Sequence, residues 1–246
     1  MIDIDITDII RTQFKIDQQD MWTAVPCIVT NVVNNMEEQR VDVRPSVVTL
    51  LKDGSGDDNP DILGVPVIFP GSMSSLISFP INAGDTVLCV FASRSIDNFK
   101  IGSGQPTVAN DMRRFSDQDA IAIPGLFSFS KSINRPGVRK FPHNSNRDLC
   151  ISHNVGSGTE VSLILKQDGN VEVKTDFDIL FQSGRKIALN APQMEVNVPT
   201  TTWVGNIEHT GNYTITGVAT FNGIPFDTHK HTGIMPGTGT SAGPVA

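Results

Sequence analysis

The stretch VSLILKQDGNVEVKT, residues 161–175, opens a series of short alternating segments that decides the fold of this chain. Five more follow at short intervals: DILFQS (178–183), KIALNA (186–191), QMEVNV (193–198), TWVGNI (202–207) and NYTITG (212–217). Apolar and polar residues alternate in most of them, so one face of each extended strand is apolar. No helical segments separate the strands, as a parallel α/β sheet would require. The pattern therefore predicts an all-β chain with a winding stack of short strands.

Each of these strands offers only a small apolar surface. The alternating apolar positions are Val161, Leu163, Leu165, Val171, Val173, Ile179, Phe181, Ile187, Leu189, Met194, Val196 and Val198. Such a set suffices for one wall of a narrow prism, but not for a closed single-chain solenoid. Further copies of the chain would supply the other walls and pair the strand edges. This predicts an intertwined trimeric β-helix, a triple-stranded β-prism, over residues 148–226. A β-meander packed on the N-terminal domain remains the alternative.

The N-terminal half has a different pattern. Residues 1–22 are expected to form a helix or arm, since Ile6, Ile9, Ile10 and Phe14 lie near helical spacing. Residues 23–93 contain β-branched runs at 24–33, 40–51, 61–70, 75–81 and 85–93, separated by a polar loop at 53–61 and a tight turn at 82–85. Five strands in this length predict a small, OB-fold-like barrel. Residues 94–147 are expected to be an irregular connector, with one buried segment at 120–129.

Composition excludes several classes of function. The net charge of −7 and the pI near 5.1 argue against a nucleic-acid partner and against an anionic lipid surface. Cys27, Cys89 and Cys150 lack the spacing of a disulfide framework or of a thiolate zinc site. The acidic N-terminus does not resemble an export signal, and no apolar run is long enough for a transmembrane helix. Contact with a membrane would therefore be transient.

Residues 227–246 contain a candidate metal site, His229-Lys230-His231, followed by a tail of small residues. In an extended strand His229 and His231 point to the same side, with Lys230 pointing away. Threefold symmetry would bring six imidazoles together in two layers, which form an octahedron. Octahedral imidazole coordination suits ferrous iron or another mid-series divalent ion better than zinc. Because ligation requires neutral imidazole, protonation at about pH 5 to 6 should weaken the site.

The order of these parts resembles the central baseplate spikes of contractile-tailed phages. The resemblance rests on Gly84-Asp85-Thr86-Val87-Leu88, Phe115-Ser116-Asp117, Ile123-Pro124-Gly125-Leu126 and His229-Lys230-His231-Thr232-Gly233. It implies an OB-fold collar at 23–93, a homotrimeric β-helix, and one Fe(II) ion held by His229 and His231 of three subunits. It also implies a virion protein, assembled in the host cytoplasm, whose collar binds the tail-tube hub or baseplate. On contraction its tip would pierce the host outer membrane.

Some larger relatives in this family carry a lysozyme domain, for which this chain has no room. The resemblance therefore implies a structural protein with no small-molecule substrate. The main rival is a tailspike-type polysaccharide depolymerase or a glycan-binding β-helix, with candidate carboxylates at Asp168, Glu172, Asp176 and Asp178. A depolymerase also needs aromatic side chains that bind sugars, and the β region offers mainly Trp203 and Tyr213.

A second rival is an OB-fold module that binds single strands or sugars, but residues 23–93 lack interleaved basic and aromatic residues. Three further histidines, His143, His153 and His209, are isolated in the sequence and are expected to be structural or solvated. His209 differs from the other two, since Ile207 and His209 could both face a threefold axis. They would then form a second, internal ring of imidazoles.

Overall fold

A computed structural model describes residues 6–19, 21–32, 37–51, 53–135, 137–226, 228, 230 and 237. The chain divides into two compact units, Met1–Phe181 and Gln182–Ala246. The regular structure is mostly strand with few helices, as expected for an all-β protein. Among the described residues, no helix combines the length and the apolar character needed to cross a bilayer.

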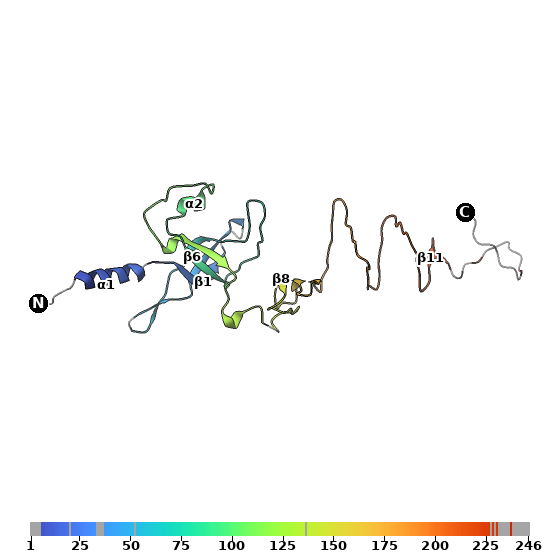
Figure 1. The fold of residues 1–246 in the computed structure, drawn as a ribbon, viewed down its shortest axis with the longest axis horizontal. Coiled ribbons are helices and arrows are strands. Elements are labelled where there is room, and N and C mark those ends of the chain that lie inside the picture. Colours follow the sequence, from blue (N-terminus) through green and yellow to red (C-terminus); the bar gives the residue numbers. More distant parts are fainter. Residues whose placement is uncertain are drawn as a thin grey trace. The chain divides into compact units, whose positions relative to one another are not determined.

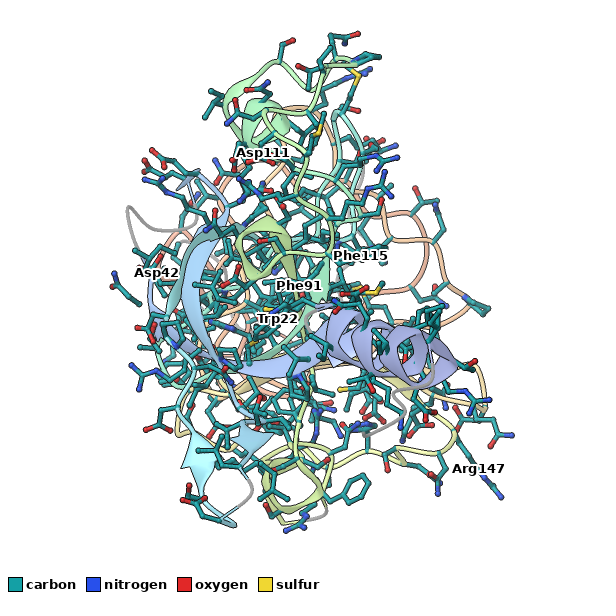
Figure 2. All side chains as sticks on the ribbon, turned by 90° about the vertical axis from the view of Figure 1, so that its left-hand side faces the viewer. Trp22, Asp42, Phe91, Asp111, Phe115 and Arg147 are labelled. Atoms are coloured by element: carbon teal, nitrogen blue, oxygen red, sulfur yellow. The ribbon has the colours of Figure 1, made fainter. Side chains whose placement is uncertain are left out.

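The helix predicted near the N-terminus is present as α1 (Ile6–Gln19). All of its large apolar side chains are exposed: Ile6, Ile9, Ile10, Phe14 and Ile16. The chain then reaches Trp22. Its backbone N–H donates to the carbonyl of Phe115 at 2.9 Å, and the centroid of its ring lies 5.1 Å from that of Phe91. Figure 2 labels these three residues near the centre of the view. They hold the end of the arm on the domain that follows.

That domain is a curled, five-stranded antiparallel half-barrel (Figure 1). Its strands are β1 (Ala24–Asn31), β2 (Arg40–Pro45), β5 (Ile62–Pro66), β6 (Thr86–Phe91) and β7 (Ala120–Pro124), in the order β5-β2-β1-β6-β7. The two outer strands approach each other. Just beyond β5, Val67 forms a parallel bridge with Ala122, and the Ile68 N–H donates to the Ala122 carbonyl at 2.9 Å. The sheet therefore curls far enough for its edges to meet.

Alternation along the strands builds the core. The fully buried side chains come from inward positions of all five strands and include Cys27, Val29, Val41, Val43, Val65, Val87, Cys89, Ala120 and Ala122. Register shifts in β1 and β2 mark bulges, which bend a sheet and increase its twist. Gly64 adopts a left-handed φ of +63° opposite the β2 shift, and its N–H donates to Asp42 at 2.8 Å. Bulges and glycine together let a short sheet curl around a narrow core.

The strand pattern departs from the sequence-based prediction in two places. Residues 75–81 form a loop with only an isolated bridge between Gly71 and Leu76. The fifth strand is instead β7, which lies within the segment expected to be a connector. Its inward positions, Ala120 and Ala122, are small enough for the close approach of the barrel edges. In addition, the predicted 53–61 loop includes part of a short hairpin, β3 (Thr49–Leu50) with β4 (Gly56–Asp57).

The connector holds three short helical elements, α2 (Asp97–Ile101), η2 (Asp117–Asp119) and η3 (Phe129–Lys131). After it, β8 (Leu149–His153), β9 (Val161–Leu165) and β10 (Val171–Lys174) form a three-stranded antiparallel sheet in the order β10-β9-β8. The strands predicted at 161–166 and 170–175 are therefore present.

The second unit contains a small hairpin, β11 (Thr220–Phe221) with β12 (Ile224–Pro225). Figure 1 draws the chain between β10 and β11 without a strand arrow. The strands predicted at 178–183, 186–191, 193–198, 202–207 and 212–217 thus have no partner strand among the described residues of the single chain.

Candidate functional site

A buried carboxylate organises one face of the three-stranded sheet. Glu160 is 1% exposed, and its carboxylate accepts from the backbone N–H groups of Gly156, Lys140 and Phe141 at 2.7, 2.9 and 3.3 Å. Burial acts to raise the pKa of Glu160, but the three donors outweigh it and hold the pKa below its ordinary value. Arg139 joins the same face by donating to Ser152 at 2.7 Å. The 138–141 segment is thereby fixed over the polar side of the sheet.

A second buried carboxylate fixes the connector against the barrel. Asp119 has no exposed surface and accepts from Arg113 and from the Ile96 N–H. Burial acts to raise the pKa of Asp119, but these hydrogen bonds keep it below its usual range. The guanidinium of Arg113 also pairs with Asp97 and Asp111. Sequence reasoning missed both carboxylates, since nothing in their local sequence distinguishes a buried acid from a surface one.

The other face of the three-stranded sheet is apolar and mostly exposed, although Leu163 is half-buried. The register aligns Leu149, Leu165 and Val171 in one row across the strands, and Ile151, Leu163 and Val173 in the next. Val171 is 64% exposed and Ile151 59% exposed. Isolated exposed apolar residues are common, but a contiguous patch of this kind marks an interaction surface.

The chain beyond β10 extends this uncovered apolar character. Across 175–219 the large apolar side chains are exposed, among them Phe181, Leu189, Val196, Val198, Trp203 and Ile215. Among the described residues, the hydrogen bonds between backbone groups include none from 175–218, and Ala219 accepts one from Phe226. One side-chain contact of this stretch reaches a distant part of the chain, that of Asp176 with Lys140. The other hydrogen bonds described for the stretch are local, such as that of Ser183 with the Lys186 carbonyl. Both its backbone and its apolar side chains are therefore available to another chain.

The four candidate carboxylates of a depolymerase are not brought together as a pair. Glu172 pairs with Lys166 at 2.8 Å and with Lys174 at 2.7 Å, and hydrogen bonds from both lower the pKa of Glu172 to about 2. Asp168 accepts from the Asn170 N–H within its own turn. Asp176 pairs with Lys140, and Asp178 is exposed. A glycosidase acid needs a raised pKa, so Glu172 has the opposite environment.

The predicted metal ligands, His229 and His231, lie outside the described residues. Within the described part of the chain, no group of three or more His, Cys, Asp or Glu side chains is placed to hold a metal. His209 contacts the Asn212 carbonyl at 3.1 Å and packs 5.6 Å from the ring of Tyr213. His143 lies near Asp148 and Lys166, and His153 is the last residue of β8.

Two comparisons with known proteins bear on identity. A search of curated proteins finds no match. Residues 25–125 match the family model described as the phage protein Gp138 N-terminal domain. These residues begin in β1 and end just after β7, so the match coincides with the curled five-stranded sheet. The chain is thus similar over this region to the N-terminal domain of a phage protein, which supports a phage structural protein of the Gp138 type and a place in the virion.

Proposed function

We propose that this chain is one subunit of a homotrimeric central spike at the tail baseplate tip of a contractile-tailed phage. The observation that carries the proposal is the exposure of large apolar side chains, both on one face of the three-stranded sheet and along residues 175–219. Within the described chain, no backbone group of residues 175–218 is bonded to another backbone group, and apolar side chains alternate with polar ones in most segments of the stretch. A single chain cannot keep such a strand series stable in water.

Three intertwined copies would satisfy both needs. Strands from neighbouring copies would pair the open backbone, and the apolar faces would meet around a threefold axis. The result would be the proposed trimeric β-helix over 148–226. Its stiffness would come from continuous hydrogen bonding between chains around a dry core.

The curled sheet would be the collar, with an OB fold. An OB fold is a partly open five-stranded barrel. The observed strand order and the parallel bridge between Val67 and Ala122 agree with that architecture. We assign the collar the task of binding the tail-tube hub or baseplate, and the shaft the task of transmitting force on contraction.

The proposed tip is an Fe(II) ion held by His229 and His231 of the three copies. Six imidazoles provide an octahedral set, and the ion would tie the three C-termini into one hard point. The tip would meet the host outer membrane only during penetration. No chemical step on a substrate belongs to this function.

Light scattering combined with metal analysis of the untagged protein tests the proposal. A trimer with about one iron per three chains is expected from the two-layer imidazole geometry. His229→Ala with His231→Ala should remove the iron and leave the trimer intact. A metal-free monomer would contradict the whole proposal, whereas a metal-free trimer would contradict the tip alone.

A further inference from the structure

A groove in the first unit joins the barrel to the apolar face of the three-stranded sheet. It has a volume of about 580 Å³. One wall is the loop at 75–81, through Ile77, Phe79 and Pro80. The opposite wall is the sheet, chiefly through Ile151, Leu163 and Val173. The groove is therefore mostly apolar on both sides.

The loop wall is held in place from the barrel side. The buried ring of Phe69 meets Phe79 edge-on at 5.0 Å, and Ile81 is buried in the barrel core. The Ile77 N–H donates to the Pro70 carbonyl at 2.9 Å. Gly71 is required here, since a Cβ would lie 2.8 Å from the Ser75 carbonyl oxygen. The anchored loop still leaves Ile77 65% exposed.

The segment that follows β10 has the pattern needed to fill this groove. In extended chain, Phe177, Ile179 and Phe181 point to one side. The residue before them, Asp176, pairs with Lys140 of its own chain. Phe177, Ile179 and Phe181 follow this ion pair directly along the chain. They remain well exposed in the single chain, with Phe181 at 75%, so they do not fill their own groove.

We propose that the groove receives Phe177, Ile179 and Phe181 of a second copy of this chain. The interface between copies then includes a loop of the barrel as well as the shaft. Each barrel is consequently tied to the strand of its neighbour at the point where the shaft begins. This inference rests on the proposed self-association, but it adds a specific contact which a trimer could lack.

A photo-cross-linker tests this contact in the full-length protein. Benzoylphenylalanine in place of Ile77 should, on irradiation, give covalent dimers and trimers on a denaturing gel. Mass spectrometry of the digest should place the adduct within 175–181. The matched control carries the same group in place of Met73, which is fully exposed in the 71–76 turn and does not line the groove. It should give no adduct with 175–181.

A charge substitution provides a second, independent measurement. Ile77→Asp places a carboxylate in the groove and should raise the concentration at which trimers half-dissociate by more than about tenfold. Met73→Asp should leave it unchanged. A trimer that gives no cross-link to 175–181 and tolerates Ile77→Asp would overturn the groove contact and leave the proposed function standing. A monomer by light scattering would overturn both.

Discussion

The curled sheet and the stretch from 175 to 219 are built from the same kind of alternating sequence, yet their side chains end in opposite environments. Val43, Val65 and Val87 have no exposed surface in the barrel. Leu189, by contrast, is 73% exposed in the stretch. The barrel closes on itself, because its strands curl until β5 and β7 meet. Between β10 and β11, the described residues of the stretch form no strand that could pair with another part of it. Alternation thus specifies which face must be covered, while topology decides whether the same chain can cover it.

The largest expected difference between the two regions is the loss of stability caused by a charge in the barrel core. Val87→Asp buries a carboxylate without a partner and should cost about 4 kcal/mol or more, enough to unfold the barrel. Circular dichroism during thermal unfolding measures the loss. Val196→Asp is the matched variant in the proposed shaft, and it should leave barrel melting unchanged while weakening the proposed trimer. Equal loss of barrel stability in both variants would contradict the separation.

Arg113→Ala should cause the next largest loss of stability, and the loss should be in the barrel and its connector. Without the guanidinium, Asp119 keeps its full burial but loses its main partner. Removing one member of a buried pair typically costs about 3 to 5 kcal/mol. Urea unfolding measures the change, with the exposed neighbour Arg114→Ala as control. If Arg113→Ala lowers the free energy of unfolding no more than Arg114→Ala does, the burial of Asp119 does not depend on its pairing with Arg113.

Glu160→Gln tests the three-stranded sheet, which lies between the two regions along the chain. The amide replaces one accepting oxygen by a donor that faces backbone N–H groups, so the expected cost is about 1 to 3 kcal/mol. The pKa of Glu160 is lowered in the folded state. Its contribution is therefore present above the unfolded pKa and is lost as the pH falls through the folded pKa. Wild-type stability should fall toward acid more steeply than that of Glu160→Gln, which pH-dependent urea unfolding would reveal.

The smallest effect is expected at one position of the shaft. Val196→Ser removes apolar surface that is 53% exposed in the single chain, so barrel melting should change by less than about 0.5 kcal/mol. The proposed trimer should dissociate at a higher concentration, since each of its three copies would lose an apolar contact. Sedimentation at several concentrations measures this. Dissociation at the wild-type concentration would place Val196 outside the interface.

Local sequence allowed much of the barrel to be predicted. The arm helix, four of the five strands and the turn at 82–85 were expected, because helical periodicity, strict alternation and Asn-Ala-Gly-Asp are local signals. The Asp85 N–H indeed donates to the Asn82 carbonyl at 3.1 Å. The fifth strand was missed, since AIAIP resembles a buried segment of any kind. Its role depends on a bridge to Val67 that only the folded chain brings about.

The candidate site was predictable in part. The apolar positions of 161–198 could be identified from alternation, and all of them except the half-buried Leu163 are exposed in the single chain. Glu160 and Arg113 could not be identified, because their importance arises from burial and from backbone donors distant in sequence. The groove beside Ile77 was equally hidden, since 75–81 has the alternation of a strand and forms a loop instead.

Amide hydrogen exchange of the full-length protein tests the central claim most directly, since it reports whether the backbone of 175–219 is paired. If neighbouring copies pair these strands, amides across 175–219 should exchange as slowly as those of β1 and β6, at a molar mass of three chains by light scattering. Rapid exchange across 175–219, with the barrel still protected, would contradict the account.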